Sequence, residues 1–311
     1  MDVGSANPTL NRSHVHPIEI LWPPVSEQRA IASVLGTLDD KIEQNRRTSA
    51  ALERLARAIF RAWFVDFEPV KAKAAGAKSF AGMPEATFDL LPDGLVSSEL
   101  GLIPRGWRSV AVSDLVVGIY DGPHATPPES SDGPVFLGIK NLTGTRIDLT
   151  EIRRMSETDW PRWTKRVVPR AEDIVFTYEA TIGYFALIPP GLRCCLGRRM
   201  ALMRPNDEAS ARYLFHYAVS DRFQRLLAER TVHGSTVNRT SLTEFPNYPV
   251  LTPPPPVIEA FDTIASPIWA AIHAGEAESA KLAEVRDYLL PRLLSGRVRV
   301  REAVQQAEAL T

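Results

Sequence analysis

The chain has 311 residues, of which 36 are lysine or arginine, 37 are aspartate or glutamate and 44% are hydrophobic. That length accommodates one large domain or two ordinary ones, and the composition is typical of a folded globular protein. The balanced charge excludes a broadly polycationic nucleic-acid binder but leaves room for a local basic surface. The sequence has no apolar run of roughly 18 residues, as a membrane span needs, and no signal-peptide pattern at its N-terminus. We therefore expect a cytoplasmic protein without membrane attachment.

The first predicted element is a long helix over residues 27–64. Ser26 is placed to cap it, because a serine hydroxyl accepts a hydrogen bond from the free backbone N–H groups of a first helical turn. Its stripe alternates in steps of four and three residues, which is an a/d heptad series. The members of the series are residues 31, 35, 38, 42, 45, 49, 52, 56, 59 and 63. Two members, Asn45 and Ser49, are polar, and we expect them to fix the register of a helical pair.

Two segments of different character follow this helix. Residues 68–99 contain lysines, small residues and prolines, and we expect them to form a poorly ordered linker. Between residues 100 and 252, short apolar runs alternate with turn-forming residues, a pattern typical of strands, and helical spacing near 208–229 predicts one helix. The predicted fold class is therefore α+β, with one curved mixed-sheet domain. The predicted strands are Val110–Val117, Val135–Ile139, Asp173–Tyr178, Ile182–Ile188 and Met200–Met203.

A second long helix is predicted over residues 257–294, within a segment, 253–296, that again begins with prolines. Apolar positions of the first helix match apolar positions here at a constant offset, which brings Ile31 onto Phe261. A helix of this length is not stable alone when its apolar stripe is exposed. We therefore predict that the two helices form a long antiparallel two-helix coiled-coil rod. A kink or break in the second helix is predicted at Pro267, Gly275 and Pro291.

Basic residues concentrate in two stretches of the middle segment. Residues 153–170 hold six basic against two acidic residues, and residues 193–239 hold nine arginines against four acidic residues. Trp160, Trp163 and Tyr178 are interleaved with them. Arginines and aromatics on a loop-rich sheet favour phosphate neutralisation and contacts to base edges. An ordinary solvated surface explains the same charges and stays open as the alternative.

No catalytic motif accompanies these residues. The sequence lacks the glycine-rich phosphate loops, the HExxH pair of zinc proteases and the carboxylate and Glu-x-Lys set of metal nucleases. The adjacent Cys194 and Cys195 supply neither a disulfide framework nor a zinc site. His124, His216 and His233 have no nucleophile or carboxylate at a telling spacing. We therefore expect a non-enzymatic protein without cofactor or metal, and a nuclease with an unfamiliar site is the enzymatic alternative.

Several further motifs occur in a fixed order along the chain. The motifs on the predicted helices are Pro23–Ile31, Leu38–Asn45 and Ala62–Phe67. The motifs in the middle segment are Ile103–Trp107, Asp121–Pro127, Asp173–Phe176, Glu179–Gly183 and Gly234–Asn238. Together they resemble the specificity (S) subunit of type I restriction-modification systems, the HsdS family. The resemblance covers about residues 4–296.

The resemblance implies an order of domains. It implies a first long helix at 23–67, a target recognition domain at 100–252 and a second helix at 253–296, followed by a C-terminal tail at 297–311. In that family another recognition domain precedes the first helix. Residues 4–13 resemble the last turn of such a domain, so residues 1–22 are expected to be its remnant in a shortened S subunit.

The resemblance also implies partners. An S subunit recognises double-stranded DNA, docks methyltransferase (M) subunits on its helices and joins restriction (R) subunits through the complex, without activity of its own. One recognition domain contacts one half-site, so we expect that a homodimer paired through its helices would read a two-fold symmetric site. The alternative is a scaffold or decoy that docks M subunits without binding DNA.

Candidate contact residues follow from the basic stretches and from the early Asp121–Pro127 loop. The candidates for DNA binding are His124, Thr126, Lys140, Arg153, Arg162, Lys165, Arg166, Arg198, Arg199 and Arg239. Trp63, Phe64 and Phe67 are the candidates for the partner interface, since aromatic side chains are favoured interface anchors. The alternative for these three is that they pack under the recognition domain.

Overall fold

The computed structural model describes residues 12–19, 22–234 and 237–308. Most of the segment that resembles the end of an earlier recognition domain therefore lies outside the described residues. Ser235 and Thr236 of the Gly234–Asn238 motif also lie outside them.

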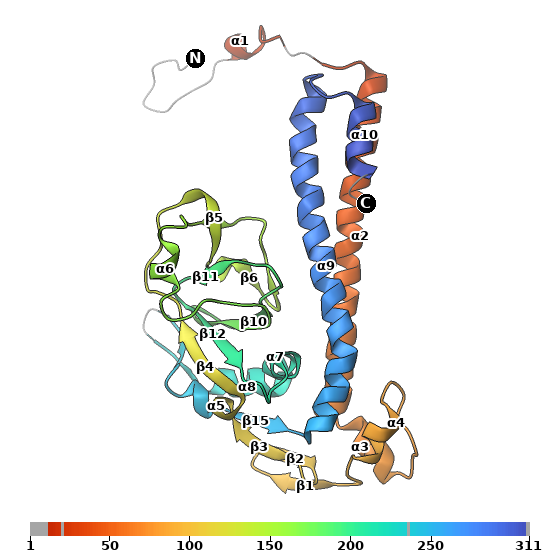
Figure 1. Ribbon diagram of the computed structural model, residues 1–311, viewed down its shortest axis with the longest axis vertical. Coiled ribbons are helices and arrows are strands. Elements are labelled where there is room, and N and C mark those ends of the chain that lie inside the picture. The colour runs from red at the N-terminus through yellow and green to blue at the C-terminus, as the bar shows by residue number, and fades with distance from the viewer. Residues whose placement is uncertain (1–11, 20–21, 235–236, 309–311) are drawn as a thin grey trace. The chain divides into compact units, whose positions relative to one another are not determined.

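The chain divides into two compact units, and each is described by itself. Unit 1 comprises the chain up to residue 51 together with the chain from residue 274, and unit 2 comprises residues 52–273. The helices α2 (Val25–Phe64) and α9 (Pro255–Leu294) each contribute to both units. The predicted α+β class and the two long helices are confirmed (Figure 1).

In unit 1 the two long helices form an antiparallel pair. Arg286 donates to Asp39 with an Nη1–Oδ1 distance of 2.8 Å, and Asn45 donates to Glu278 with an Nδ2–Oε2 distance of 2.6 Å. Contacted residue numbers therefore fall along α9 as they rise along α2. The apolar heptad positions fill the seam between the helices. Buried there are the heptad residues Ile31 and Leu38 with Val34 of α2, and Leu282, Leu289 and Leu293 of α9, while the heptad residues Leu35 and Ile42 are partly buried against them.

The polar heptad positions lie where the helices approach closely. Ser49 is 2% exposed, and a Cβ added to Gly275 would lie 3.4 Å from its Oγ. The same Cβ would lie 3.8 Å from Cβ of Asn45. Together with the hydrogen bond from Asn45 to Glu278, this close approach fixes the register of the seam, as the sequence predicts.

Two local details of the helices differ from the predictions. Of the kink or break predicted in α9, a break does not occur, since the helix runs through Pro267, Gly275 and Pro291. Packing of its apolar face sustains the helix where these residues disfavour it. Ser26 lies inside the first turn of α2 rather than at its cap, because the helix begins at Val25, one residue before Ser26.

Shorter helices accompany the pair in unit 1. α1 (Arg12–Val15) precedes α2, and α10 (Val300–Glu308) follows α9. Ala303 of α10 is fully buried in one cluster with Ile31 and Leu293, so the segment expected to be a tail contributes to the core of unit 1. Among the described helices, none combines the length and apolar character needed to cross a membrane.

Unit 2 is built on a six-stranded antiparallel sheet. Register shifts within β10 and β12 mark bulges, which increase the local twist of a sheet. The strand order is β13 (Thr231–Val232), β14 (Arg239–Thr240), β9 (Ile174–Glu179), β12 (Met200–Pro205) and β4 (Val116–Asp121), with β10 (Thr181–Leu187) also paired to β9.

Strand β9 is buried on both faces. Ile174 and Phe176 belong to the main core of unit 2, whereas Val175 belongs to a second core together with Val135 and Leu202. Successive side chains of a strand point to opposite faces of the sheet, so alternate residues of β9 serve the two cores. This explains why the strand reads as a continuous apolar run.

A smaller mixed sheet covers the second core. Strand β11 (Cys194–Leu196) pairs in parallel with β5 (Ser130–Leu137), which pairs antiparallel with β8 (Arg153–Arg154). Three two-stranded sheets complete the β structure: β1 (Leu95–Ser98) with β2 (Gly101–Pro104), β3 (Arg108–Ala111) with β15 (Pro249–Thr252), and β6 (Leu142–Thr143) with β7 (Arg146–Ile147). The shorter helices of unit 2 are α3 (Glu68–Ala74), α4 (Glu85–Asp89), α5 (Val112–Leu115), η1 (Ile139–Asn141), α6 (Trp160–Trp163), α7 (Ala211–Ala218), α8 (Asp221–Glu229) and η2 (Phe245–Asn247).

Two predicted elements are each divided in the structure. The strand predicted over Val110–Val117 contains the helical turn α5 between β3 and β4. The helix predicted near 208–229 is two helices, α7 and α8. Ser220 separates them, since its Oγ accepts a hydrogen bond from N of Phe223 at 3.4 Å and caps the second helix.

The segment 68–99 is folded, so the prediction of a poorly ordered linker is wrong. It contains α3 and α4, and its side chains Val70 and Phe88 are buried in the main core. Lys73 Nζ donates to the carbonyl oxygens of Phe88 at 3.1 Å and of Leu91 at 2.7 Å. These bonds satisfy carbonyl groups that the end of α4 leaves without helical partners.

An aromatic cluster joins the helices of unit 2 to its strand-rich part. Trp63, Phe64 and Phe67 are 3%, 1% and 4% exposed. The ring centroid of Phe64 lies 6.0 Å from that of Trp107 and 5.4 Å from that of Phe261. The three aromatic residues expected at a partner interface are therefore inside the protein, where they offer no surface to a partner. The alternative, packing against the segment 100–252, describes the structure, since the rings of Phe64 and Phe67 both contact that of Trp107.

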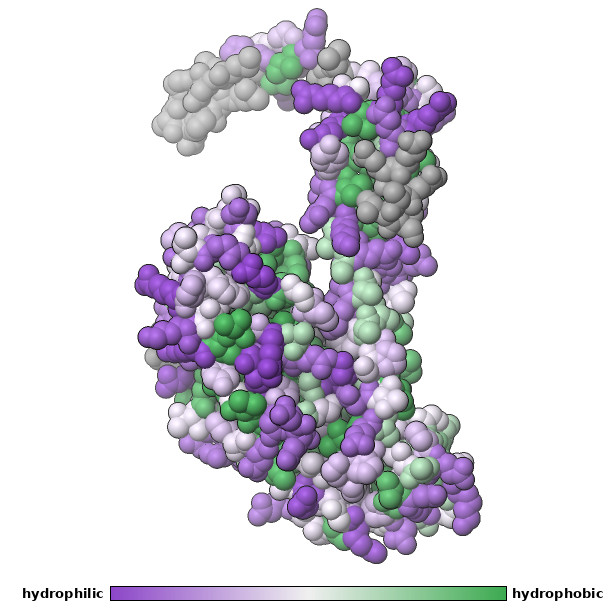
Figure 2. Space-filling model, in the orientation of Figure 1, coloured by the Kyte–Doolittle hydropathy of each residue, from purple (hydrophilic) through white to green (hydrophobic). Residues whose placement is uncertain are grey.

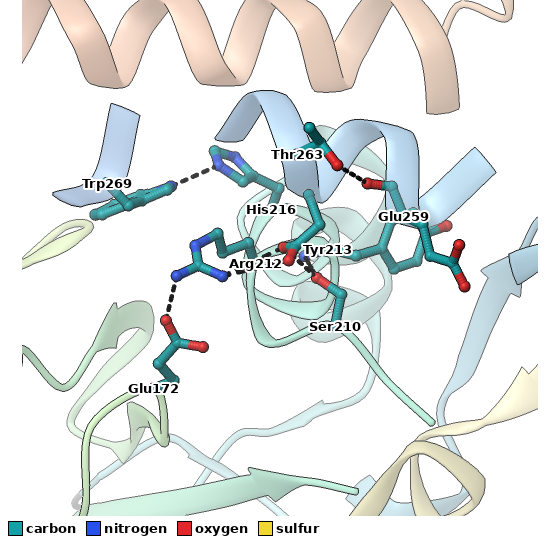
Figure 3. Close-up of polar contacts among 9 residues, drawn as sticks. Glu172, Ser210, Arg212, Tyr213, His216, Glu259, Thr263 and Trp269 are labelled. Carbon is teal, nitrogen blue, oxygen red and sulfur yellow. Dashed lines mark hydrogen bonds and ion pairs between the residues drawn. The ribbon is translucent and has the colours of Figure 1, made fainter. Parts of the chain in front are cut away.

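Polar contacts connect α7 to α9 within unit 2 (Figure 3). Ser210 donates to Asp262 with an Oγ–Oδ1 distance of 2.8 Å, and Arg212 bridges Asp262 and Glu172. Trp269 Nε1 donates to His216 Nε2 at 3.1 Å. The last bond pairs the buried Trp269 Nε1 with His216 Nε2 next to the aromatic cluster, and the contacts together connect α7 to α9.

We predict that Phe64→Ala lowers the free energy of unfolding by about 3–5 kcal/mol, because it leaves a cavity in the aromatic cluster. Leu55→Ala on the same helix is the matched control, since Leu55 is 50% exposed. Its effect should stay within about 0.5 kcal/mol. Urea titration followed by circular dichroism measures both changes, and similar losses for the two variants would contradict the described packing.

Acid should destabilise unit 2 through His216. Burial lowers the pKa of His216 to about 3, against about 6.5 in an unfolded chain. As the pH falls, the unfolded state therefore binds this proton before the folded state does. The stability that neutral His216 contributes is present above about pH 6.5 and declines as the pH falls towards 3. We expect about 2 kcal/mol to be lost between pH 7 and pH 5 from this residue. Urea titrations at both values should show a smaller difference for His216→Gln, and an equal difference would contradict the prediction.

Candidate nucleic-acid interface

One end of the six-stranded sheet gathers charged residues from distant parts of the sequence. Strands β4 and β9 end at Asp121 and Glu179, and β14 begins at Arg239. The register pairs Ala201 with Asp121 and Arg239 with Glu179, so these strand ends lie at the same end of the sheet. We call this region the sheet end. It consists of Asp121, Glu179, Arg198, Arg199 and Arg239, together with the side chains that contact them.

Each carboxylate of the sheet end holds basic side chains. Asp121 accepts a hydrogen bond from Arg166, and its Oδ2 lies 3.3 Å from Nε2 of His124. Glu179 Oε1 lies 3.3 Å from Nε of Arg199. Four of the side chains expected to contact DNA are thus at the sheet end by direct contact or by strand register, and the exposed Arg198 is adjacent to Arg199.

Tyr178 lies beneath these charges. It is 6% exposed, and burial raises the pKa of its hydroxyl. The negative charges of Asp121 and Glu179 raise that pKa further, while Arg166 lowers it. The hydroxyl is therefore protonated at neutral pH and is a hydrogen-bond donor next to two carboxylates.

The backbone of the sheet end is strained. Ala180 and Arg199 have φ angles of 68° and 73°, in the left-handed region that residues other than glycine adopt rarely. Such conformations cost about 1–3 kcal/mol each and persist only where surrounding contacts hold them. Here Ala180 N donates to Asn238 O at 3.0 Å, and Tyr178 N donates to Arg199 O at 3.2 Å. The side chain of Arg199 is thus presented from a backbone position that the sheet itself fixes.

A close backbone approach positions the Asp121–Pro127 loop. Gly122 N donates to Met200 O at 3.0 Å. A Cβ added to Gly122 would overlap the carbonyl oxygen of Gly197, so only glycine fits. The loop that carries His124 and the turn that carries Arg199 therefore keep a fixed separation.

For the remaining five candidates, no ion pair or strand register among the described residues ties them to the sheet end, although Thr126 shares a loop with His124 and Lys165 is adjacent to Arg166. Lys140 and Arg153 are engaged in ion pairs. Nζ of Lys140 lies 3.6 Å from Oε2 of Glu151, and Nη2 of Arg153 lies 3.3 Å from Oε2 of Glu129. The other three, which are exposed, are Thr126, Arg162 and Lys165. On the face displayed in Figure 2, hydrophilic residues cover most of the strand-rich part of unit 2. The structure thus brings about half of the candidates together.

Sequence reasoning missed the acidic partners of these arginines. Asp121 and Glu179 are the first residues of the motifs Asp121–Pro127 and Glu179–Gly183, but the basic stretches, which supply most of the predicted contacts, contain neither. Only Glu179 had a usable signal, since it directly follows the predicted strand Asp173–Tyr178, whereas Asp121 lies four residues beyond the predicted strand Val110–Val117. Tyr178, the last residue of its predicted strand, carried the same signal.

The described residues offer little for catalysis. Within the described ranges, no group of three or more histidine, cysteine, aspartate or glutamate residues is placed to hold a metal ion. Asp173 is fully engaged by Arg204, with N–O distances of 2.8 and 2.6 Å. Cys194 and Cys195 are buried free thiols in different clusters, and burial raises the pKa of Cys195 to about 12. A thiol with such a pKa is a poor nucleophile at neutral pH.

Together, the fold and this sheet end define a class of protein: an α+β domain with an arginine-rich sheet end, flanked in sequence by two long helices. No family model matches the chain. The chain is 24% identical, over 94% of its length, to the type I restriction enzyme HindI specificity subunit of Haemophilus influenzae. It is 26% identical, over 96% of its length, to the type I restriction enzyme MjaIX specificity subunit of Methanocaldococcus jannaschii.

The chain is thus a homologue of type I restriction enzyme specificity subunits, and the resemblance inferred from its motifs is confirmed. It covers 71% and 65% of the lengths of these two relatives. The crystal structure of the type I restriction-modification S subunit from M. genitalium shares the fold, with a TM-score of 0.52 at 13% identity. That match covers 94% of this chain and 67% of the other.

The close approach at Gly122 gives a testable prediction. Gly122→Ala should lower the free energy of unfolding by about 1–3 kcal/mol, because the added methyl group overlaps backbone atoms that cannot move away cheaply. Gly36→Ala in α2 is the control, since nothing lies within 4 Å of its added Cβ and alanine favours a helix by up to about 1 kcal/mol. Chemical denaturation compares the two, and an unchanged stability for Gly122→Ala would refute the close approach.

Proposed function

We propose that this chain is a sequence-specific DNA-recognition subunit without catalytic activity, which binds double-stranded DNA through residues 100–252. The observation that carries the proposal is the homology to specificity subunits over 94% or more of the chain. The sheet end supports it physically. Its arginines project from a fixed backbone, and arginine contacts both phosphate oxygens and base edges.

The proposal includes partners and location. By the same homology, the chain assembles with a type I M subunit along the segments 23–67 and 253–296, and with the R subunit through the complex. Because Trp63, Phe64 and Phe67 are buried, the M subunit would contact the outer faces of the helices instead. Such a protein works in the cytoplasm, where the chromosome and its partner subunits are present.

The number of recognition domains bears on the DNA site. A single domain contacts one half-site, and two copies related by a two-fold axis would read two identical half-sites. A homodimer within the complex would therefore recognise a two-fold symmetric, split sequence.

Duplex binding should be specific and salt-dependent. The full chain, co-expressed with its M subunit, is selected on a randomised duplex library, and its affinity for the preferred duplex is then measured by fluorescence anisotropy over a range of salt concentrations. Arg239→Gln and Arg162→Gln should each reduce the salt slope by about one unit if the side chain contacts phosphate. If it contacts a base, the variant should instead lose about 1–3 kcal/mol on the preferred duplex alone.

Arg105→Gln is the control for these variants. Arg105 is exposed, lies outside the two basic stretches and forms a surface ion pair with Asp93 at an Nη1–Oδ1 distance of 3.5 Å. Its affinity and salt slope should equal those of the unmodified chain. A complex that prefers no duplex at any salt concentration would favour the scaffold or decoy function instead.

A further inference from the structure

The sheet end contains two carboxylates where a surface that only binds phosphate would have none. Asp121 and Glu179 have side chains 26% and 25% exposed, so their charges are partly open to solvent within the 100–252 region that we propose for DNA binding. Negative charge beside a polyanion lowers affinity, because binding depends on neutralising phosphates with cations. The two carboxylates therefore need a different role from that of the arginines.

Their contacts show what they do to those arginines. Asp121 accepts from the guanidinium of Arg166, and Glu179 lies 3.3 Å from Nε of Arg199. An arginine side chain has many rotamers, and immobilising it on binding costs free energy. A carboxylate that already holds the guanidinium removes part of that cost and fixes the direction of its remaining N–H donors.

The backbone adds a second restraint on Arg199. Its φ of 73° is a strained value for a residue with a side chain, and its own carbonyl oxygen accepts from N of Tyr178 at 3.2 Å. Its side chain is 29% exposed, so part of it is already desolvated. An arginine required only to reach a phosphate needs neither restraint, because a flexible cation suffices for an attraction without direction.

We propose that Asp121 and Glu179 are specificity-determining residues, which orient Arg166 and Arg199 for contacts to G·C base pairs in the major groove. This inference rests on the proposed function of DNA recognition. The chemistry of a G·C pair fits both partners. Guanine O6 and N7 accept from arginine, and the amino group of cytosine N4 donates to a carboxylate beside it. The same carboxylates repel phosphate, which weakens binding to unrelated DNA.

A comparable pair at the opposite end of β9 has a different role. Glu172, which precedes β9, has a φ of 67° and contacts Arg212. Figure 3 shows Arg212 next to Glu172. Nη1 of Arg212 also lies 3.4 Å from Oδ2 of Asp262 in α9, and the Arg212 side chain is 15% exposed. This pair connects the loop before β9 to α9. It therefore provides a control with the same residue types, one left-handed residue in the pair (here the carboxylate residue) and no part in the sheet end.

The test compares three carboxylate variants of the full chain in complex with its M subunit. Asp121→Asn and Glu179→Gln remove the charge at the sheet end, and Glu172→Gln removes it at the other end of β9. Each complex is measured by fluorescence anisotropy on the duplex that the unmodified complex selects from a randomised library and on a scrambled duplex of equal length. We expect Asp121→Asn and Glu179→Gln to lower the preference for the selected duplex about tenfold each, equivalent to about 1.4 kcal/mol.

Binding to the scrambled duplex separates orientation from ordinary charge effects. Asp121→Asn and Glu179→Gln should bind it as tightly as the unmodified complex or more tightly, because a repulsive charge is gone. Duplexes selected by these variants should also lose a G·C requirement at one position. Glu172→Gln should keep the original preference. If all three variants behave alike, the inference is overturned, and the proposed function stands.

If a carboxylate variant does not fold, Arg199→Lys tests the proposed role of Glu179 instead. Arg199→Lys keeps the positive charge but lacks the two-pronged donor arrangement of a guanidinium. It should lose the preference about tenfold and keep the salt slope, whereas an unchanged preference would overturn the inference for Glu179. If the unmodified complex prefers no duplex, both the inference and the proposed function fail.

Discussion

The packing of Phe64 is the contact on which unit 2 depends. Its ring lies 4.9 Å from Phe60 on the same helix, 5.0 Å from Tyr213 on α7 and 5.4 Å from Phe261 on α9, measured between ring centroids. Segments separated by about two hundred positions in the sequence thus meet at one side chain. Aromatic pairs at these distances add favourable interactions to the burial of their area. The sheet end can keep a fixed geometry because the sheet that carries it rests on this cluster.

The sequence was most informative where one periodicity extends over many residues. The heptad series of α2 predicts both the helix and its pairing, since an apolar stripe of that length needs a partner. Strand β9 was equally readable, because burial on both faces produces a continuous apolar run. Short elements were not. α5 interrupts an apolar run that has no helical period, and α7 and α8 are separated at Ser220 by a cap that a periodicity search ignores.

The candidate site was harder to predict than the fold for a physical reason. Antiparallel register brings Asp121, Glu179 and Arg239 to one end of the sheet. Register depends on bulges and loop lengths, which the sequence does not reveal. Charge composition identified the arginines without showing which of them lie close together in the fold. The prediction for segment 68–99 is wrong for a similar reason. Its prolines and lysines are typical of disorder, but Lys73 donates hydrogen bonds to backbone carbonyl groups.

The placement of the two cysteines has a consequence for the chemistry of the second core. Cys194 and Cys195 are neighbours in the sequence, but on β11 their side chains enter different clusters on opposite faces. Their sulfur atoms therefore cannot meet to form an intramolecular bond without unfolding the strand. Oxidants react with thiolates, and burial keeps both groups in the thiol form. The two thiols of the smaller mixed sheet are consequently poor targets for oxidants while the strand stays folded.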